Sequence, residues 1–395
     1  MTDPLPSRRG PRPLLLHLTL AMLRSNASLA GSMSWKPGSP DWKPPAGVEA
    51  EAAFLRGIRA WHAHPWHRDL ADPPVIWTEG GARLLDYGGE GPVVLFVPSL
   101  VNGWNVLDLM EGHSMTRWLA EQGVHPMLLD WGPPEPAFTL TDHIAGRLCR
   151  ALRAAAMRAD SGKAVLAGYC MGGTFAVAAA ALCPDLISGL ILLAAPWDFH
   201  AGPADVLQNI APAQDMLEPL LRAVATVPVD WLQTLFALRD PDAVAEKFRR
   251  FARLDPDSDA ARLFVAIEDW LNSGAALSAT TALECLRDWY GENLPMRGAW
   301  RIAGLPVDPA AIAVPAFVAV PKRDWIVPPG SAHALAQRLP RATLWEPEAG
   351  HVGMTAGRRA PSLLWTPMRD WLRDAAAGQG RPNGKRPGSA PLALP

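Results

Sequence analysis

Cys170 lies in the part of the chain best suited to carry out chemistry. Residues 168–173 read GYCMGG, with glycines on both sides of the cysteine. The apolar run 163–167 predicts a buried strand before this motif, and the alanine-rich run 174–180 predicts a helix after it. A sharp turn between a strand and a helix exposes the residue at its tip, and the amides of a helix N-terminus favour a thiolate there. The pattern therefore predicts a cysteine nucleophile, although a cysteine taken alone would more often be a small core residue.

An acid and a base follow in the order that this chemistry requires. Asp324 comes directly after the predicted strand 314–320, and His351 follows the strand-like run 342–346. Nucleophile, acid and histidine in this order along the chain are typical of α/β-hydrolase triads. Taken singly, Asp324 could cap a turn and His351 could be an ordinary loop residue. Together the three residues predict a Cys170–His351–Asp324 triad at the carboxyl ends of parallel strands.

The composition allows a large core and argues against nucleic-acid binding. The chain has 395 residues, of which 49% are hydrophobic, and its formal net charge is −2. A nearly neutral chain offers phosphates little attraction, so we expect no nucleic-acid partner. The four cysteines have neither CxxC nor zinc-like spacing, which predicts a reducing cytoplasm and no metal site. The 17 tryptophans are expected in the core, although some could line an acyl-binding surface.

The first 74 residues are expected to form an N-terminal extension. Arginines precede the apolar run 13–23, as in a signal peptide, but polar residues interrupt the run and it is too short to span a bilayer. We expect an amphipathic helix there that packs on the core or on a hydrophobic surface, and no transmembrane segment. The mixed composition of 35–74 predicts irregular structure. Within it, His62, His64 and His67 are expected in a surface loop rather than in a metal site.

Alternating strand and helix signals define the rest of the chain. They cover residues 75–198 and 306–375 and predict an α/β core, a mainly parallel sheet with helices on both faces. Residues 199–305 contain only helix-like runs, so we expect a helical cap, or lid, over the site. Residues 1–12 and 376–395 are rich in proline, glycine and basic residues, which predicts disordered tails. The expected elements are strands 75–77, 82–87, 93–97, 126–129 and 189–194, helices 115–121 and 144–159, and cap helices 216–225, 231–238, 243–251, 260–270 and 280–289.

The sequence resembles the polyhydroxyalkanoate synthases, cysteine-dependent relatives of lipases that polymerise hydroxyacyl-CoA. The resemblance extends from about residue 75 to residue 373 and does not rest on one motif. Similar segments are 97–102 (VPSLVN), 128–132 (LLDWG), 168–173 (GYCMGG), 290–293 (YGEN), 302–304 (IAG), 324–328 (DWIVP) and 350–353 (GHVG). The segments that lead out of the cap are most similar to the shorter synthases, which work with a partner subunit.

Two positions depart from that family. Trp325 stands where a histidine is common, and residues 103–105 (GWN) stand where a basic residue or proline and then a tyrosine are common. Both departures lie near the expected site and bear on substrate preference and on polymerising ability. Asn102, Trp104 and Trp325 are therefore the expected substrate contacts.

The resemblance implies an acyltransferase that polymerises (R)-3-hydroxyacyl-CoA into polyhydroxyalkanoate and releases CoA. His351 would deprotonate Cys170, which takes up the acyl group, and would then activate the hydroxyl of the next unit. Asp324 would either orient His351 or help to deprotonate that hydroxyl. The backbone N–H groups of Met171 and Val101 are the expected oxyanion hole.

The same interpretation carries expectations about cofactors, partners and location. No cofactor is expected beyond the CoA thioester substrate. The expected partners are hydroxyacyl-CoA, the growing polyester, the granule surface, and a second copy or a partner synthase subunit, with the protein in the cytoplasm or at the polymer granule. The alternatives are a thioesterase or esterase of the same fold, which would more naturally use serine, and a non-catalytic granule-associated protein.

Overall fold

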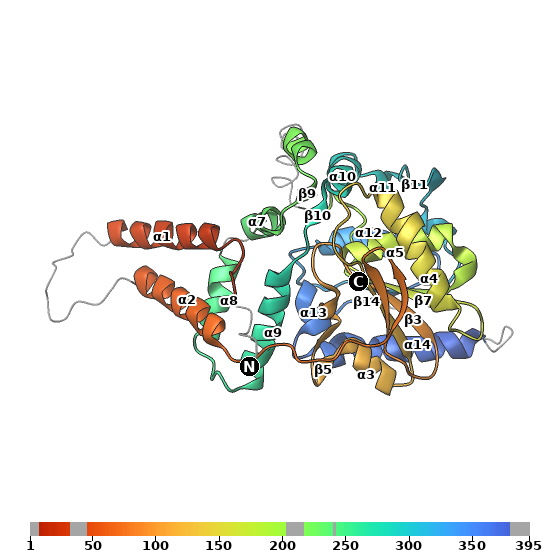
Figure 1. Cartoon of the computed structure of the whole chain (residues 1–395), viewed down its shortest axis with the longest axis horizontal. Coiled ribbons are helices and arrows are strands. Elements are labelled where there is room, and N and C mark those ends of the chain that lie inside the picture. Colours follow the sequence, from red (N-terminus) through yellow and green to blue (C-terminus); the bar gives the residue numbers. More distant parts are fainter. Residues whose placement is uncertain (1–7, 32–45, 203–216, 240–241, 380–395) are drawn as a thin grey trace, which may run out of the picture.

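An eight-stranded sheet forms the centre of the molecule (Figure 1). The computed structural model describes residues 8–31, 46–202, 217–239 and 242–379. In spatial order the strands are β1 (Val75–Glu79), β2 (Ala82–Asp86), β6 (His125–Asp130), β3 (Val93–Val97), β7 (Ala164–Tyr169), β8 (Ile187–Leu193), β13 (Ala316–Ala319) and β14 (Ala342–Trp345). The β1–β2 hairpin and the β2–β6 pair are antiparallel, whereas all pairs from β6 to β14 are parallel. The predicted mainly parallel sheet is confirmed.

Helices cover both faces of this sheet because its central strands are apolar along their whole length. Every residue of β3, β7 and β13 is buried. The covering helices are α3 (Met115–Glu121), α4 (Cys149–Ala156), α5 (Met171–Leu182), α12 (Pro329–Arg338) and α14 (Thr366–Gln379). Side chains of α4, α5 and α12 join the core on one face, and those of α3 and α14 join the core on the other.

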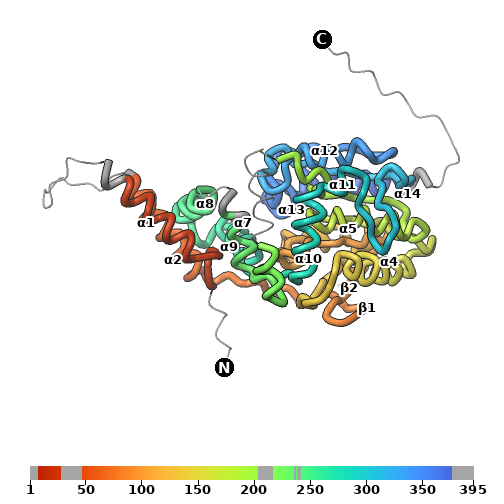
Figure 2. Tube along the Cα trace, turned by 90° about the horizontal axis from the view of Figure 1, so that it is seen from above, coloured from red at the N-terminus to blue at the C-terminus, as the bar shows by residue number. Residues whose placement is uncertain are grey.

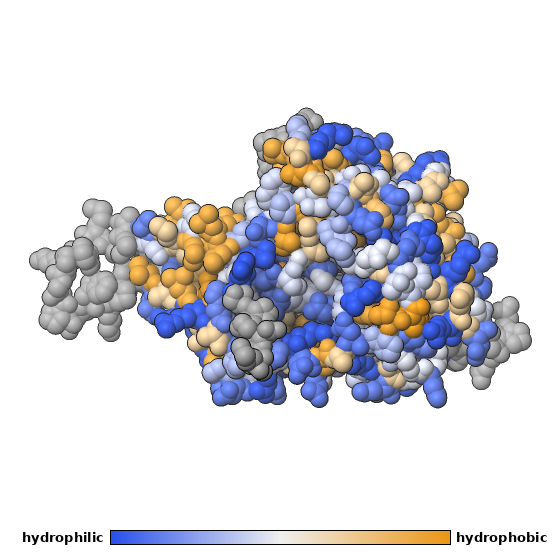
Figure 3. All heavy atoms as spheres, in the orientation of Figure 1, coloured by the Kyte–Doolittle hydropathy of each residue, from blue (hydrophilic) through white to orange (hydrophobic). Residues whose placement is uncertain are grey.

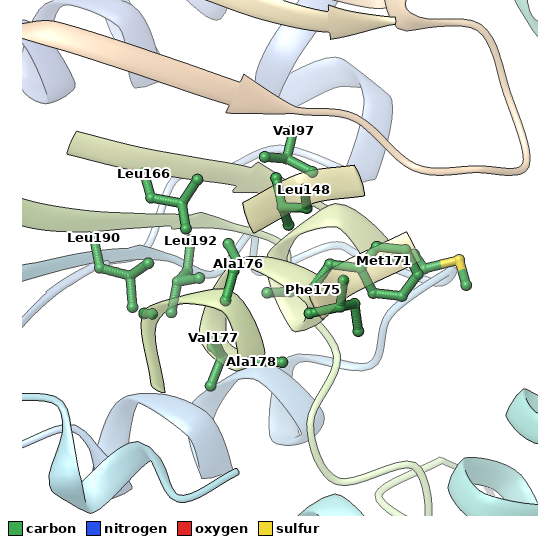
Figure 4. Close-up of a cluster of buried hydrophobic side chains, with 14 of the residues drawn as sticks. Val97, Leu148, Leu166, Met171, Phe175, Ala176, Val177, Ala178, Leu190 and Leu192 are labelled. Carbon is green, nitrogen blue, oxygen red and sulfur yellow. The ribbon is translucent and has the colours of Figure 1, made fainter. Parts of the chain in front are cut away.

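Helix α5, which follows Cys170 directly, is fixed against the sheet by its packing. In Figure 4, Leu166 and Leu192 come from neighbouring strands and lie beside Ala176 of α5, while Met171 and Phe175 lie toward the start of the helix. All residues of α5 from Met171 to Ala180 are buried. The helix is therefore held on both sides, and its N-terminus has a fixed position relative to the sheet.

Further helices, small strand pairs and helical turns complete the described part of the chain. The remaining helices are α1 (Leu14–Gly31), α2 (Ala46–Ala63), α7 (Val229–Arg239), α8 (Ala243–Phe251), α9 (Asp259–Ser273), α10 (Ala279–Glu284), α11 (Leu294–Arg297) and α13 (His351–Ala356). Small hairpins pair β4 (Asp108–Met110) with β5 (His113–Ser114) and β11 (Arg301–Ile302) with β12 (Leu305–Pro306), and a further antiparallel pair joins β9 (Thr226–Val227) to β10 (Leu277–Ser278), which are distant in sequence. Turns of 3₁₀ or π-helix span Trp104–Val106, Asp142–Leu148, Pro184–Leu186, Cys285–Gly291, Pro309–Ala311 and Pro361–Trp365.

The N-terminal helices form a lobe of their own with part of residues 199–305. This segment, the predicted cap, is called the insertion. Helices α1 and α2 lie against α8 and α9 beside the sheet-containing core (Figures 1 and 2). The centre of the lobe is aromatic, with Phe54 and Trp61 of α2 packed edge-on against Phe248 of α8. A side chain at Gly57 would collide with the backbone of Phe248, so the two helices touch directly. Only part of the predicted cap, including α7 and α10, therefore belongs to the region next to the core.

The prediction of irregular structure over 35–74 is wrong for residues 46–63 and correct for residues 64–74, which form neither helix nor strand; residues 35–45 lie outside the described part of the chain. Helix α2 occupies Ala46–Ala63, and its Phe54, Ile58 and Trp61 are buried at helical spacing. The predicted surface loop of histidines is wrong for His62 and His64 but correct for His67, which is exposed and lies outside any helix or strand. His62 is helical and contacts the carbonyl oxygen of Gly10 at 2.8 Å, and His64 is buried against the carbonyl oxygen of Pro256 at 2.9 Å.

The predicted tails are shorter than expected. Arg8 is fixed by Asp269, with Nε–Oδ1 at 2.7 Å and Nη2–Oδ2 at 2.9 Å, and it donates to the carbonyl oxygen of Trp61 at 3.1 Å. Helix α14 continues to Gln379, so the last residues that could form a disordered tail, 380–395, lie outside the described part of the chain, as do residues 1–7. No helix in the described ranges has the length and apolar character needed to cross a membrane.

Candidate active site

Cys170 occupies a strained turn between β7 and α5. Its backbone has φ 56° and ψ −128°, an unfavourable conformation for a residue with a side chain. The N–H of Cys170 donates to the carbonyl oxygen of Leu193 in β8 at 2.9 Å, and its carbonyl oxygen accepts from the N–H of Gly173 at 2.8 Å. These two bonds hold the strained turn. They leave the thiol half-buried at the carboxyl end of the strand.

The glycines around Cys170 are required by close backbone packing. A Cβ on Gly172 would collide with the carbonyl oxygens of Val97 and Pro98, and a Cβ on Gly168 would collide with the first turn of α5. A Cβ on Gly173 would collide with the side chain of Ala195. The motif therefore lets α5 start directly against the ends of β3, β7 and the segment after β8.

Asp324 and His351 meet beside this turn. His351 Nδ1 lies 2.6 Å from Asp324 Oδ2, and both side chains are buried. The other oxygen of Asp324 accepts from the N–H groups of Ile326 and Val327 at 2.8 and 2.9 Å. The carboxylate therefore has a fixed orientation, and it holds the imidazole through Nδ1, so that Nε2 takes no part in this contact.

The loops that carry the acid and the base are joined to each other. The N–H of Lys322 donates to the carbonyl oxygen of Pro347 at 3.1 Å, and the N–H of Arg323 donates to that of Ala349 at 3.0 Å. These bonds continue the pairing of β13 and β14 beyond the strands. As a result the relative position of Asp324 and His351 is set by the sheet.

Electrostatics favour the charged form of His351. Burial alone would lower the pKa of this imidazole, but the negative charges of Cys170 and Asp324 and hydrogen bonds to both side chains raise it to about 10. The thiol of Cys170 is thus a hydrogen-bonding neighbour of the ring. A protonated imidazole between a carboxylate and a thiolate is the ion pair that activates cysteine nucleophiles.

Tyr169 packs against His351, the expected base. The sequence-based prediction gives Tyr169 no role. Its ring lies against that of His351 with centroids 5.1 Å apart, and its hydroxyl contacts the carbonyl oxygen of His351 at 3.4 Å. Burial, followed by the negative charges of Cys170 and Asp324, raises the pKa of Tyr169 well above its usual value. Tyr169 therefore stays neutral and acts as packing for the imidazole. Its position next to Cys170 in the motif was the available signal.

The two residues expected to form the oxyanion hole follow β3 and β7, which are neighbouring strands of the sheet. Met171 is the first residue of α5, where backbone N–H groups lack partners within the helix. The N–H of Val101 donates to Ser99 Oγ at 3.2 Å. Val101 must release this bond before it can donate to an oxyanion.

The loop that contains Val101 is held by the insertion. The carbonyl oxygen of Val101 accepts from the N–H of Ala275 at 3.0 Å, and that of Gly103 accepts from Trp270 Nε1 at 2.7 Å. Between them, Asn102 Oδ1 lies 3.4 Å from Gln233 Nε2. Three consecutive residues of this loop thus accept hydrogen bonds from residues 233–275. A shift of this part of the chain would move the expected oxyanion donor.

The expected substrate contacts do not all come together. Asn102 and Trp104 line a cavity of about 50 Å³ between the 99–104 loop and residues 275–278. One face of Trp104 is covered by the guanidinium group of Arg68, 5.3 Å from the ring centroid. Trp325 is 45% exposed and lies outside this lining, as do Cys170, Asp324 and His351.

The described residues contain no group of three or more His, Cys, Asp or Glu side chains placed to hold a metal ion. The four cysteines, Cys149, Cys170, Cys183 and Cys285, are all free thiols. Cys170, His351 and Asp324 bring together one thiol, one imidazole and one carboxylate, a combination typical of nucleophilic sites.

The sheet order, the turn at Cys170 and the buried Asp–His pair define a protein of the α/β-hydrolase type with cysteine in the nucleophile position. A family model described as alpha/beta hydrolase fold matches residues 132–355, which is more than half of the chain. The chain belongs to this family, as its sequence predicts. Among solved structures, MenH from S. aureus is 17% identical, with a TM-score of 0.49, over 74% of this chain and 98% of that chain.

Its curated relatives carry a more specific name. Poly(3-hydroxyalkanoate) polymerase subunit PhaC of Haloferax mediterranei is 28% identical over 313 residues, which cover 76% of this chain and 63% of that protein. The protein of the same name from Synechocystis sp. is 29% identical over 297 residues, 71% of this chain and 77% of the relative. The chain thus spans less than two thirds of the Haloferax protein. The resemblance to polyhydroxyalkanoate synthases is confirmed.

Proposed function

We propose that this chain is an acyltransferase that polymerises (R)-3-hydroxyacyl-CoA into polyhydroxyalkanoate and releases CoA. The observation that carries the proposal is Cys170 at the turn, in hydrogen-bonding contact with a His351 that is fixed by Asp324. Similarity to polymerase subunits supports the substrate class. A thiol is suited to this task because it exchanges with the thiol of CoA at little cost in free energy.

The first half-reaction loads the enzyme. The thiolate of Cys170 attacks the carbonyl carbon of the acyl-CoA, and the N–H groups of Met171 and Val101 stabilise the oxyanion. Each such donor contributes about 3–4 kcal/mol. The C–S bond to CoA then breaks, and the imidazolium of His351 gives its proton to the departing CoA thiolate. An acyl group remains on Cys170 as a thioester, and His351 is neutral.

The second half-reaction extends the polymer. The hydroxyl of a second hydroxyacyl unit attacks the thioester while neutral His351 takes its proton, which contributes about 100- to 10,000-fold in rate. The new ester bond forms and the bond to Cys170 breaks. The leaving thiolate and the imidazolium together restore the starting ion pair. Asp324 orients His351 in both steps, and the cycle needs no cofactor beyond the CoA thioester.

Exclusion of water separates a polymerase from a hydrolase of the same fold. The insertion is well placed for this role because Ala275, Trp270 and Gln233 hold the loop that contains Val101. We propose that entry of the acyl chain displaces the residues of the insertion that hold this loop. The N–H of Val101 then leaves Ser99 and turns to the oxyanion, so that the hole is complete only with substrate present.

The proposal extends to partners and location. The relatives are named as polymerase subunits, so we propose that this chain works in the cytoplasm with a partner synthase subunit or a second copy. We further propose that α1 contacts the polymer granule. Leu15, Met22 and Leu23 of this helix are 78, 66 and 59% exposed, and Figure 3 shows hydrophobic residues gathered over α1 and α2. The side chains of α1 that are described and exposed are all uncharged, which suits a polyester surface.

Purified protein incubated with 3-hydroxybutyryl-CoA and its longer homologues tests the proposal. Release of free thiol and turbidity from insoluble polyester are followed together, with and without a candidate partner subunit. We expect both signals from the native protein and neither from Cys170→Ala. Cys285→Ser, a change at a buried thiol on another helical turn, serves as the matched control and is expected to retain both. Thiol release without polymer under every condition would identify a thioesterase, and no release would favour a non-catalytic protein.

A further inference from the structure

A second pair of thiols lies away from the nucleophile turn. Cys149 is the first residue of α4, and Cys183 directly follows the last residue of α5. These two helices flank β7 in sequence and cover the same face of the sheet. Because α5 has 12 residues, Cys183 is about 18 Å from the Cys170 end of the helix. The mechanism above makes no use of either thiol.

The fold brings the two thiols into contact. The helical turn Pro184–Leu186, which begins directly after Cys183, packs against α4. The side chains of Cys149 and Cys183 are hydrogen-bonded to each other, and both lie against the same hydrophobic core. The N–H of Cys183 donates to the carbonyl oxygen of Ala179 at 2.8 Å, which fixes its backbone at the end of α5. Both residues are partly exposed, so a small reagent in solvent can reach them.

The surroundings make the two thiols unequal. The hydrogen bond from Cys149, aided by the positive charge of Arg153 and opposed by burial, lowers the pKa of Cys183 to about 7. The same hydrogen bond and burial raise the pKa of Cys149. Near pH 7 Cys183 is therefore the member of the pair that ionises more readily, and about half of its population is thiolate. A thiolate beside a thiol is the arrangement that reacts with oxidants and then resolves to a disulfide.

We infer that Cys149 and Cys183 are an oxidative modification site that forms an intramolecular disulfide when the protein meets hydrogen peroxide. The Cys183 thiolate attacks one oxygen of the peroxide, the O–O bond breaks, and a sulfenic acid and hydroxide are formed. The sulfur of Cys149 then attacks the sulfenic sulfur. An S–S bond forms, the S–O bond breaks, and the oxygen leaves as water with the proton of Cys149. Two thiols are oxidised by two electrons, and the peroxide is reduced to water.

The disulfide joins the start of α4 to the end of α5 without reaching Cys170. Hydrogen-bonded thiols need only a small approach to reach the S–S bond length of about 2.0 Å. In a reducing cytoplasm such a bond is transient, and it is reversed by thiol exchange. The inference is independent of the proposed function, because it concerns thiols that the acyl-transfer cycle does not use.

Peptide mapping of the full-length protein tests the inference. The protein is treated with increasing hydrogen peroxide, its remaining thiols are alkylated, and the non-reduced digest is analysed by mass spectrometry. We expect a linked peptide that contains Cys149 and Cys183, that disappears on reduction with dithiothreitol, and that forms at peroxide concentrations which leave the buried Cys285 unmodified. Cys285→Ser is the matched control and should give the same linked peptide in the same yield.

Single-cysteine variants distinguish the thiol that reacts with peroxide from the thiol that then forms the disulfide. In Cys149→Ser the linked peptide should be absent and Cys183 should accumulate as a sulfenic acid, trapped by dimedone. In Cys183→Ser, Cys149 should react at least ten-fold more slowly with peroxide than Cys183 does in the first variant. The inference is overturned if both thiols remain alkylatable at a peroxide concentration that oxidises Cys170. It is also overturned if Cys183 pairs with another chain, or if the linked peptide joins other cysteines.

Discussion

Replacement of Asp324 by asparagine is the perturbation that most directly probes the geometry of the base. The carboxylate accepts three hydrogen bonds, from His351 Nδ1 at 2.6 Å and from the N–H groups of Ile326 and Val327. Asparagine keeps one oxygen for the two backbone groups and therefore presents its NH₂ to the imidazole. Two donors then face each other, so the neutral ring is expected to move its proton from Nδ1 to Nε2. In that tautomer His351 cannot accept a proton from Cys170 or from an incoming hydroxyl.

The size of the effect follows from the steps that are lost. General-base assistance contributes about 100- to 10,000-fold, which corresponds to about 3–5 kcal/mol in the activation free energy. Burial lowers the pKa of His351, but the charge of Cys170, followed by the charge of Asp324, raises it to about 10. Asp324→Asn should therefore lower this pKa. The imidazolium will then be lost at a lower pH than in the native protein.

Single-turnover release of CoA, followed with a thiol reagent between pH 6 and 11, measures both effects. We expect at least a 100-fold loss of rate at pH 8 and a high-pH limb that moves to lower pH. Asp160→Asn is the matched control, since Asp160 is exposed and precedes β7 at the opposite edge of the sheet. A rate for Asp324→Asn within ten-fold of the native protein, with an unchanged pH profile, would refute the assignment of Asp324.

Four further predictions test the remaining parts of the account. Gly172→Ala should reduce the free energy of unfolding in urea by about 1–3 kcal/mol, because its Cβ would collide with backbone oxygens; Gly353→Ala, with open space around its Cβ, should cause no such loss. Cys170→Ala removes the largest cause that raises the pKa of His351, so NMR titration should show this pKa about 1–3 units lower; a value still near 10 would contradict the ion pair. Because the His351 pKa is raised, its stabilising contribution should be complete below about pH 6.5 and lost as the pH rises through about 10, and a native protein equally stable at pH 7 and pH 11 would contradict this. Phe248→Ala should cost about 3–5 kcal/mol locally and increase hydrogen exchange in α2 and α8, and unchanged exchange there would argue against a shared lobe core.

The nucleophile turn could be predicted because its signals are local. The glycines, the apolar strand and the helix-forming alanines lie within 20 residues of Cys170. The glycines are required because α5 packs directly against the ends of the strands, and both the strand and the helix are visible in the same stretch of sequence. Asp324 and His351 were predictable for a related reason. Each follows a short strand, and strands in a parallel sheet end at the same edge.

The N-terminal lobe could not be predicted in the same way. Phe54 and Trp61 are buried only because Phe248 and Phe251 cover them, and these partners lie about 190 residues further along the chain. The run 35–74 contains prolines and histidines that obscure the helical period of α2. With no visible partner for its apolar face, this helix looked like irregular structure.

The hydrogen bonds between the insertion and the loop that contains Val101 could not be predicted for the same reason. Val101 could be nominated from its place after a strand, but nothing near it in sequence reveals Ala275 or Trp270 as its neighbours. The hydrogen bond between the Val101 N–H and Ser99 Oγ was likewise not foreseen. Local sequence specifies the turn that carries a reactive group, whereas long-range packing decides how the loops around it are held.

Trapping of the acyl-enzyme tests the central claim most directly. Purified protein is mixed with 3-hydroxybutyryl-CoA, quenched in acid within the first turnover, digested and analysed by mass spectrometry. The account predicts a hydroxyacyl group on the sulfur of Cys170 in an amount equal to the CoA released, and no such adduct in Cys170→Ala. An acyl group on a different residue, or CoA released while Cys170 remains unmodified at every time point, would contradict it.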